Sequence, residues 1–474
     1  MLFNSYEFIF IFLPISCFVY FFLNKQRLTI ASKAWIVLSS LFFYSWWNII
    51  YLPLILISIL FNYTVTSSII ERDKKKIKGP SRKFLFQLGL FFNIGLLIYF
   101  KYMDFFIENT NLVIGTNIEL LHLALPLAIS FFTLQQIAYL VDSYEGLVKE
   151  KSFLNYTVFV VFFPQLIAGP IVHHKEMMPQ FSQPRNKLKS YKNISLGLFI
   201  FSLGMFKKIV IADTLSIWAT EGFNGDTPMN LLEAWSTSLS YTFQLYFDFS
   251  GYTDMAVGAA LLFNIKLPQN FNSPYKATGM IDFWRRWHMT LTSFITTYIY
   301  TPIVRSFKKL NFHKAMLATI LSFLIAGLWH GASWMFVVFG GLHGLGIAIN
   351  HYWRKKIKFK LNNMVAWFIT FNFVNVTFVF FRAEDWDNAI RVLSGMANAN
   401  VEIISSSWPN SINGFISPPV WIFIALAVAV SFDNSNQLLE KFKPNLKYLF
   451  GFITLSFISI MEMNKESEFL YFNF

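Results

Sequence analysis

Long apolar runs alternate with short polar segments from one end of the chain to the other. Many of the runs approach the roughly 20 residues that a helix needs to cross the hydrocarbon core of a bilayer. The pattern predicts an all-α polytopic membrane protein with about 11–12 transmembrane helices. The expected crossings are 7–23, 30–47, 50–70, 84–101, 120–141, 194–220, 234–263, two within 315–352, 364–382, 419–432 and 448–462.

The distribution of lysine and arginine predicts which side of the membrane each connection occupies. Residues 71–83 and 354–360 are strongly basic, whereas residues 102–119 and 221–233 contain acidic residues and no lysine or arginine. Basic connections remain on the cytoplasmic side of bacterial membranes. We therefore expect the first two segments inside and the other two outside, together with the polar stretch 383–418 and the N-terminus.

Two segments do not fit a simple crossing. Residues 153–172 are apolar, but basic sequence flanks them on both sides, and Gly169 and Pro170 interrupt them. Broken backbone at membrane depth is tolerated where protein or a water-filled cavity satisfies it, so this pattern predicts a re-entrant segment. Residues 266–314 mix basic and aromatic positions, which is typical of interfacial helices at the cytoplasmic face.

Composition agrees with this interpretation. Of 474 residues, 55% are hydrophobic and 14% are charged, which leaves too little polar surface for a soluble protein. The net charge of +13 is interpreted as positive-inside topology near anionic lipid, not as nucleic-acid binding. Cys17 is the single cysteine, which excludes a disulfide framework. We expect one membrane domain over residues 1–474.

His330 is the strongest candidate for chemistry in this apolar chain. It lies 16 residues after Lys314, so a helix would carry it about 24 Å into a core roughly 30 Å thick. A neutral imidazole at that depth suits a general base, because its unperturbed pKa is near 6.5. Trp329 and Trp334 are expected to supply apolar walls.

Several other polar residues in apolar surroundings have simpler interpretations. His343 is expected to hydrogen-bond a neighbouring helix. Asp248 and Asp254 lie six residues apart, on different helical faces, and each is expected to bind its own polar partner. His173 and His174 are expected to be solvated in a cytoplasmic loop.

The usual signatures of covalent, nucleotide-dependent or zinc chemistry do not occur in the sequence. There is no G-x-S-x-G, no P-loop and no H-E-x-x-H. Direct acyl transfer from a thioester to a hydroxyl is a reaction that one or two histidines can serve without a covalent nucleophile. It requires base assistance to the hydroxyl and stabilisation of an oxyanion.

Five motifs resemble those of membrane-bound O-acyltransferases, in particular the bacterial branch that contains the membrane subunit of alginate O-acetylation. They occur in the family's order within the region 162–390. They are FFPQLIAGPIVHHKEMMPQF (162–181), QLYFDFSGYTDMAVGAALLFNIKLPQNFNSPY (244–275), DFWRRWHMTLTSFITTYIYTPI (282–303), LWHGASWMFVVFGGLHGLG (328–346) and FVFFRAEDWDNAI (378–390).

The resemblance implies a fold in which helices surround a central cavity open toward both membrane faces. By position, the catalytic histidine of the family falls on His330 and its second active-site residue on His288. We expect His330 to assist the acceptor hydroxyl and His288 to polarise the donor thioester. The basic region near His288 would face acetyl-coenzyme A, whose phosphates would favour Arg285, Arg286 and Lys276.

The resemblance further implies an enzyme that moves acetyl groups across the bacterial cytoplasmic (inner) membrane to an exported polysaccharide of the alginate type. Acetyl-coenzyme A is expected as donor substrate, with no permanently bound cofactor, no metal and no nucleic acid. A periplasmic serine esterase-like acetyltransferase is the expected partner, beside membrane lipids. Peptidoglycan O-acetylation is the alternative acceptor chemistry. A transporter is the alternative class, although the internal repeat usual in transporters is not visible.

Overall fold

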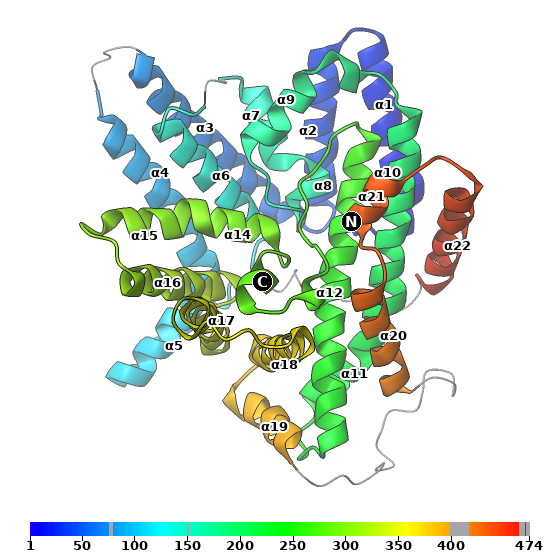
Figure 1. Cartoon of the computed structure of the whole chain (residues 1–474). Helices are drawn as coiled ribbons and strands as arrows, with labels where there is room; N and C mark the ends of the chain where they lie inside the picture. Colours follow the sequence, from blue (N-terminus) through cyan, green and yellow to red (C-terminus); the bar gives the residue numbers. More distant parts are fainter. Residues whose placement is uncertain (75–78, 149–150, 399–416, 464–469, 471–474) are drawn as a thin grey trace. The chain divides into compact units, whose positions relative to one another are not determined.

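The computed structural model describes residues 1–74, 79–148, 151–398, 417–463 and 470. Every regular element in these residues is a helix (Figure 1). The predicted all-α class is therefore confirmed. The chain divides into two compact units. Unit 1 comprises Met1–Phe201, Tyr252–Pro268 and Pro444–Phe452, and unit 2 comprises Ser202–Gly251, Gln269–Lys443 and Ile453–Phe474.

Unit 1 is built around the first part of the chain, in which α3, α4 and α6 pack against one another (Figure 1). Buried amides join these three helices: Asn62 of α3 donates to Gln136 of α6, and Asn93 of α4 donates to Asn62 at 2.6 Å. Such side chains bind apolar helices together, because an unsatisfied amide in hydrocarbon is costly. The helices are α1 (Leu13–Lys25), α2 (Thr29–Ser45), α3 (Leu52–Lys74), α4 (Arg82–Leu97), α5 (Met103–Ile114), α6 (Ile129–Tyr144), α7 (Phe153–Val161), α8 (Phe163–Leu166), α9 (His174–Ser182) and most of α10 (Tyr191–Met205).

The segment predicted to be re-entrant is broken into short helices. α7 has only nine residues, and α8 begins at Phe163, next to Pro164. Nine residues of helix rise about 14 Å, less than half of a bilayer core. The break lies at Phe162, before the Gly169–Pro170 pair that the sequence emphasised.

His174 is buried in unit 1, which corrects the expectation that it is solvated. Its side chain lies in α9, is 8% exposed, and its Nδ1 is 3.5 Å from a carboxylate oxygen of Asp142. The ring also packs edge-on against Tyr139. The partner Asp142 lies on α6, with α7 and α8 between it and α9, so the local sequence around the two histidines did not reveal it.

Unit 2 contains the motifs around the two candidate catalytic histidines. Its helices are η5 (Phe206–Ala212), α11 (Asp213–Asn224), α12 (Leu231–Leu262), α13 (Met280–Trp284), α14 (Met289–Ile295), η7 (Thr296–Tyr300), α15 (Thr301–Ser306), α16 (Phe312–His330), α17 (Trp334–Tyr352), η8 (Trp353–Ile357), α18 (Asn363–Arg382), α19 (Trp386–Ala397), α20 (Pro418–Ser431) and α21 (Ser435–Lys441), and α22 (Leu446–Glu462) is shared with unit 1. The first two-thirds of α12 belong to this unit, where Thr242 of α12 donates to Asn375 of α18 at 2.7 Å.

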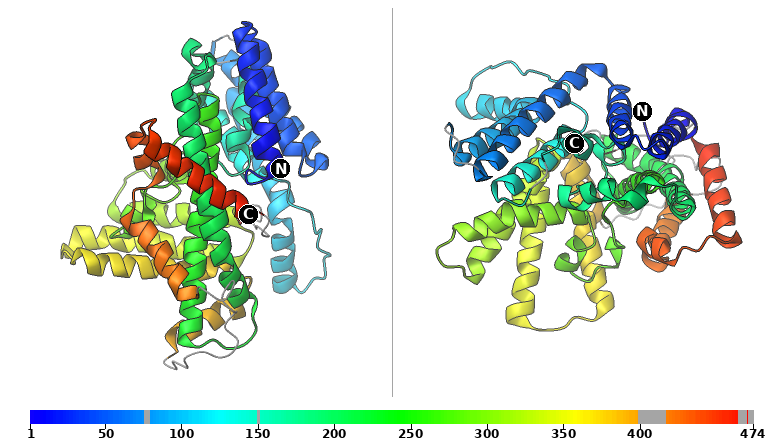
Figure 2. Two further views of the ribbon diagram at one scale, coloured as in Figure 1. Left: turned by 90° about the vertical axis from the view of Figure 1, so that its right-hand side faces the viewer. Right: turned by 90° about the horizontal axis from the view of Figure 1, so that it is seen from above.

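The α16–α17 hairpin supplies two helices that are long and apolar enough to cross a membrane, where two crossings are expected within residues 315–352. Its helices approach closely at glycines: a Cβ at Gly340 would lie 2.3 Å from the backbone oxygen of Phe323, and one at Gly327 would lie 2.2 Å from that of Phe336. Small residues permit such contact between helices in membranes. Figure 2 (right) shows α17 and α18 as two yellow arms, joined by the basic segment 353–362.

Asp248 has the polar partner that the sequence led us to expect. Lys208 of η5 lies 2.6 Å from a carboxylate oxygen of Asp248 on α12 and 2.6 Å from one of Asp213 on α11. All three side chains are buried in unit 2. Buried charges persist in apolar surroundings when they are paired in this way.

Seven helices in the described residues are long and apolar enough to cross a membrane, and an eighth candidate is the bent pair α20–α21. A polytopic membrane protein is thus confirmed. The remaining expected crossings also form helices, but α2, α6 and α22 have 17, 16 and 17 residues. These fall short of the roughly 20 residues of a perpendicular crossing. α12 has 32 residues and includes two buried aspartates.

The sequence suggested that the whole acidic segment 102–119 is a loop, but most of it is helical. α5 occupies Met103–Ile114 and ends at Gly115, which adopts a positive φ of 73°. Glycine takes this left-handed conformation without a steric penalty, so the helix stops there. Residues 75–78 of the predicted cytoplasmic loop and 399–416 of the predicted external stretch lie outside the described residues.

Candidate active site

His288 lies where the chain turns sharply into α14. Its backbone has φ 42° and ψ 54°, the left-handed region that non-glycine residues rarely adopt. Two backbone hydrogen bonds hold the turn against the preceding loop: Asn272 N donates to Arg286 O at 2.8 Å, and Met289 N donates to Asn270 O at 2.9 Å. Strained backbone that its surroundings hold in place in this way is typical of functional sites.

Asn270 holds the His288 side chain as well as its backbone. The imidazole is fully buried, and its Nδ1 lies 3.0 Å from Oδ1 of Asn270. The same oxygen accepts hydrogen bonds from the backbone N–H of Thr290 at 3.3 Å and from its hydroxyl at 2.9 Å. Three groups of the His288 turn therefore converge on one amide oxygen.

Burial keeps the His288 ring neutral. It lowers the pKa of His288 to about 3, because the charged form is disfavoured away from water. Desolvation, and not the charge of the neighbouring arginines, is the cause of this lowered pKa. The ring packs edge-on against Phe249 of α12, with ring centroids 4.8 Å apart.

His330 is the last residue of α16 and is 3% exposed. The following Gly331 ends the helix, and a Cβ there would lie 2.0 Å from the ring of Phe336. Phe381 and Phe339 flank the imidazole at centroid distances of 5.1 and 6.1 Å. Trp334 is 52% exposed, so these phenylalanines provide the wall that we expected from Trp334.

Trp329 brings the two candidate histidines to one place in unit 2. Its ring centroid lies 6.4 Å from that of His288 and 4.9 Å from that of His330. The two imidazoles come from α16 and from the turn before α14, 42 residues apart in sequence. Their common contact with one aromatic ring supports the expectation that they form one site.

His343 binds neighbouring helices on both sides, as expected. Trp284 of α13 donates through its indole N–H to Nδ1 of His343 at 3.1 Å, and Thr377 of α18 lies 2.9 Å from Nε2. The side chain is fully buried in α17. His343 therefore connects three elements and has a structural role.

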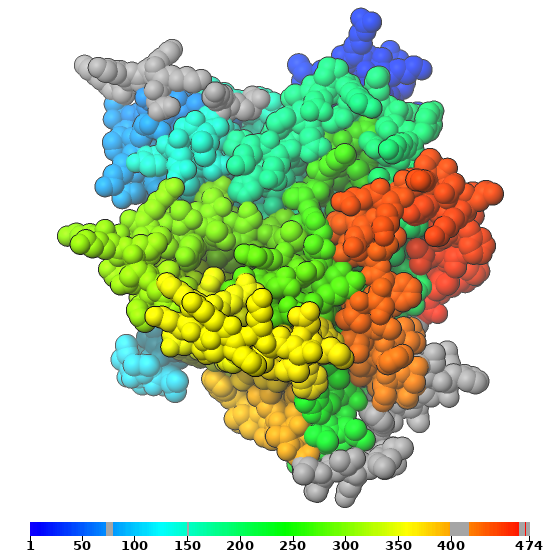
Figure 3. Space-filling view, in the orientation of Figure 1, coloured from blue at the N-terminus to red at the C-terminus, as the bar shows by residue number. Residues whose placement is uncertain are grey.

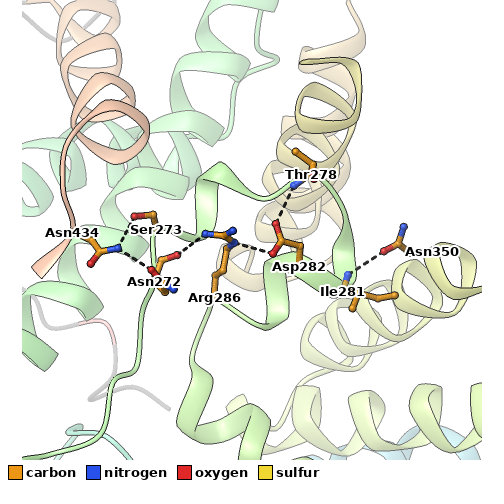
Figure 4. A network of polar contacts seen from close by, with 8 residues as sticks. All are labelled: Asn272, Ser273, Thr278, Ile281, Asp282, Arg286, Asn350 and Asn434. Carbon is orange, nitrogen blue, oxygen red and sulfur yellow. Dashed lines mark hydrogen bonds and ion pairs between the residues drawn. The ribbon is translucent and has the colours of Figure 1, made fainter. Parts of the chain in front are cut away.

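The cations near His288 differ in their surroundings. Arg286 donates to the carboxylate of Asp282 at 2.9 Å and to the backbone oxygen of Asn272 at 3.3 Å (Figure 4). Arg285 is exposed, and Lys276 donates to the backbone oxygen of Phe432 at 3.3 Å. Arg286 thus stabilises the loop with its charge compensated, whereas Arg285 presents its charge to solvent.

The loop before His288 is also held from the C-terminal part of the chain. Asn434, which caps α21, donates to Oδ1 of Asn272 and to the hydroxyl of Ser273, both at 2.9 Å (Figure 4). Asn350 of α17 accepts from the backbone N–H of Ile281 at 3.3 Å. These side chains position the loop from two sides.

A basic surface lies at one end of the α16–α17 hairpin. Figure 3 shows the yellow atoms of the α17–α18 connection next to the yellow-green atoms around α15. Lys355 lies over the ring of Phe312, which joins the two segments. The residues of the basic surface are Arg305, Lys308, Lys309, Lys314, Arg354, Lys355, Lys356, Lys358 and Lys360.

Asn270 is the site residue that the sequence did not single out. It occurs within PQNFNSPY, a stretch that we quoted only for its resemblance. Its amide is 1% exposed, and a buried amide among aromatic residues is the signal that was available. Asn270 lies 18 residues before His288, and the sequence did not reveal the contact because it depends on the loop folding back.

Comparisons with known proteins identify the family of this chain. The model of the membrane-bound O-acyltransferase family matches residues 142–383. A peptidoglycan O-acetyltransferase of Helicobacter pylori is 45% identical, over 100% of this chain and 98% of that protein. A Pseudomonas putida protein named "Probable alginate O-acetylase AlgI" is 34% identical, over 84% and 80%. A teichoic acid D-alanyltransferase of Bacillus subtilis is 28% identical, over 54% and 69%.

The family match covers half of the chain and includes Asn270, His288 and His330, and the Helicobacter relative is similar over the entire length. This evidence favours an enzyme over the transporter alternative. The chain belongs to the membrane-bound O-acyltransferase family: it is an acyltransferase and a multi-pass membrane protein.

Proposed function

We propose that this protein moves acetyl groups from cytoplasmic acetyl-coenzyme A to hydroxyls of an exported cell-envelope polysaccharide. The observation that carries the proposal is the similarity to the Helicobacter peptidoglycan O-acetyltransferase along the full length of both chains. The identity to the alginate O-acetylase is lower and covers less of each protein. These values favour peptidoglycan as acceptor over the alginate-type polymer that we preferred from the sequence.

His330 and His288 are the proposed catalytic pair. The transfer needs a group that takes the proton of the acceptor hydroxyl and a group that stabilises negative charge on the thioester oxygen. Two buried imidazoles in contact with Trp329 are suited to both tasks. The surrounding aromatic side chains exclude water, which limits hydrolysis of the thioester.

The donor is proposed to approach from the basic side of unit 2. Arg285 is exposed three residues before His288, and the basic surface defined above lies on α15, α16 and η8. Arginine and lysine bind phosphate oxygens through charge-assisted hydrogen bonds. Arg286 and Lys276 contribute to donor binding mainly by holding the loop that carries His288.

The proposal places the protein in the bacterial cytoplasmic membrane, because cytoplasmic donor and exported acceptor must meet across it. The described residues of this chain form membrane helices and their connections. Delivery to an extended polymer is therefore assigned to a separate periplasmic acetyltransferase of the serine-esterase type.

The first experiment measures base-labile acetate on purified muropeptides and on acidic exopolysaccharide. A deletion strain of the source bacterium is compared with the strain complemented by the intact gene. We expect the muropeptide acetate to disappear on deletion and to return on complementation. Loss confined to the exopolysaccharide would assign the alginate-type acceptor, and unchanged acetate on both polymers would contradict the proposal.

A second experiment tests the donor directly. Purified protein in lipid nanodiscs is incubated with acetyl-coenzyme A and its periplasmic partner, and released coenzyme A is measured. We expect release to require a catalytically intact His330. Equal release by the wild type and His330→Ala would contradict the role of the pair.

A further inference from the structure

The position of the His288 side chain follows from the loop 270–273. Oδ1 of Asn270 lies 3.0 Å from Nδ1 of His288, and the backbone N–H of Asn272 donates to the backbone oxygen of Arg286 at 2.8 Å. The side chain of Arg286 donates in return to the backbone oxygen of Asn272 at 3.3 Å. A shift of this loop would therefore shift the imidazole.

The bend between α20 and α21 comprises residues 432–436, where the two helices are bent by 48°. Oδ1 of Asn434 accepts from the backbone N–H groups of Asn436 and Gln437, both at 3.1 Å. The Gln437 side chain accepts from the backbone N–H of Asn434 at 3.0 Å, which completes a capping box at the start of α21. The oxygen of the Asn434 amide is thus used to cap the helix.

The NH2 group of the same amide holds the loop 270–273. It donates to Oδ1 of Asn272 and to the hydroxyl of Ser273, both at 2.9 Å (Figure 4). Nδ2 of Asn436 donates to the backbone oxygen of Phe271 at 2.8 Å. These three loop residues are consecutive, and each receives a hydrogen bond from the bend.

The bend is anchored independently of these contacts. Lys207 of η5 donates to the hydroxyl of Ser435 at 2.6 Å, and both side chains are buried in unit 2. Lys276 donates to the backbone oxygen of Phe432 at 3.3 Å. Contacts from elsewhere in unit 2 therefore hold the bend, so that it can serve as a fixed support for the loop.

The bend lies beyond the residues that carry the recognised motifs, because the match to the family model ends at residue 383. We infer that Asn434 and Asn436 are positioning residues of the acyltransferase. They hold the loop 270–273 and, through it, the imidazole of His288. The inference rests on the proposed function, in which His288 takes part in acetyl transfer.

Asn434→Ser separates the two tasks of this amide. Serine is as good a helix cap as asparagine, but it has a shorter side chain and no NH2 group, so α21 stays capped while the loop is released. We expect acetyl transfer per folded molecule to fall by about 10-fold, because small displacements of a catalytic group are costly in rate. The measurement is coenzyme A release from acetyl-coenzyme A by purified protein in nanodiscs with its periplasmic partner.

Gln437→Ala is the matched control. It removes the other half of the capping box, and the exposed Gln437 side chain bonds the backbone of Asn434 and not the loop. This variant should keep wild-type transfer, although its helical circular dichroism should melt at no higher temperature than that of Asn434→Ser. An equal loss of transfer in both variants would mean that α21 acts only through its stability, and would overturn the inference.

The contact is removed from the loop side with Ser273→Ala. Ser273 has a positive φ of 47°, and serine and alanine both carry a Cβ, so the backbone strain is unchanged. This variant should lose less transfer than Asn434→Ser, because the bond from Asn434 to Asn272 remains. The double variant should transfer acetyl no more slowly than Asn434→Ser alone. Losses that multiply would show that the two residues act separately, which contradicts the inferred contact.

The surroundings of the His288 ring are measured by ¹³C NMR of protein with ring-labelled histidine. His288→Gln identifies the signal among those of the eight histidines. We expect this signal to shift or broaden in Asn434→Ser and in Asn436→Ala, and to keep its wild-type position in Gln437→Ala. A His288 signal that is unchanged in both Asn434→Ser and Asn436→Ala would refute the positioning role.

The two readouts distinguish failure of this inference from failure of the proposed function. If the wild type releases no coenzyme A from acetyl-coenzyme A, the proposed function is contradicted, while the NMR comparison still tests the support of His288 by the bend. If the wild type is active and Asn434→Ser transfers acetyl at the wild-type rate, the inference is overturned and the proposed function stands. Reduced transfer together with a shifted His288 signal, in Asn434→Ser and not in Gln437→Ala, is the result that the inference requires.

Discussion

The histidines of unit 2 show how surroundings, not residue type, determine the role of an imidazole. His343 has a hydrogen-bonding partner for each ring nitrogen, supplied by α13 and α18. His330 ends a helix between aromatic rings, and His288 is clamped by one amide oxygen. The first arrangement satisfies a buried polar group, whereas the other two orient imidazoles around Trp329.

At this scale we expect His330→Ala to abolish acetyl transfer while the protein still accumulates in the membrane. The imidazole is buried among aromatic rings at the end of α16, so its removal leaves the helix intact. The measurement is polymer-bound acetate together with the amount of protein in membranes. Retention of more than a small fraction of wild-type acetate would make His330 a structural residue.

His343→Leu, in contrast, should lower the stability of the protein and leave its acetyl transfer activity unchanged. It leaves the indole N–H of Trp284 buried without its acceptor, which costs about 1–3 kcal/mol of the free energy of unfolding. The detergent-solubilised variant should lose its helical circular dichroism at a lower temperature and keep transfer activity per folded molecule. His351→Leu is the matched control, because His351 lies on the same helix and is exposed. Equal melting of both variants would refute the structural role.

At the scale of elements, close helix contacts decide where the site residues lie. α16 carries His330 and α17 carries Phe339, and the hairpin packs through glycines. In lipid there is little hydrophobic gain from bringing two apolar helices together, so close backbone packing provides the stabilisation. A displacement of α17 therefore moves the aromatic ring that flanks His330.

Gly340→Ala should destabilise the hairpin and reduce acetyl transfer. The new methyl group would lie 2.3 Å from the backbone oxygen of Phe323, so α17 must shift, at a cost of about 1–3 kcal/mol. Gly341→Ala is the control on the next residue: its methyl group would meet only the Leu324 side chain, at 3.5 Å. Thermal stability and activity of both variants are compared in detergent. Loss in the Gly341 variant alone would contradict the packing.

At the scale of the whole molecule, charge distribution predicts the orientation in the membrane. The basic surface on α15, α16 and η8 and the basic segment 71–83 are expected on the cytoplasmic side. This orientation is what places a phosphate-bearing donor beside the His288 turn.

Accessibility tags at residues 71–83 and 354–360 should therefore report a cytoplasmic location, and tags near residue 119 and in 399–416 an external one. Residue 119 is chosen because it lies beyond the end of α5 at Ile114. The labels are read with a membrane-impermeant thiol reagent on intact cells, after Cys17 is replaced by serine. External labelling at 354–360 would invert the orientation and remove the donor from the basic surface.

The sequence by itself determined the class of protein and most of its helices. Apolar run length specifies membrane helices directly, because each helix satisfies its own backbone hydrogen bonds in lipid. The five motifs also sufficed to identify an acyltransferase and to select His330 and His288 as its candidate catalytic residues. Helix ends were less predictable: α5 continues through acidic residues as far as Gly115, since helix termination depends on a single left-handed residue.

Only the tertiary structure decided which polar groups act on one another. The contact of Asn270 with His288 depends on a loop folded back through a strained turn, and that of Lys208 with Asp248 depends on the packing of η5 against α12. Neither pair has a spacing that marks it along the chain. Trp334 was expected beside His330, but it faces outward at the start of α17, and Phe339 and Phe381 replace it. Sequence periodicity gives the face of a helix, whereas the neighbours on that face follow from how the helices pack.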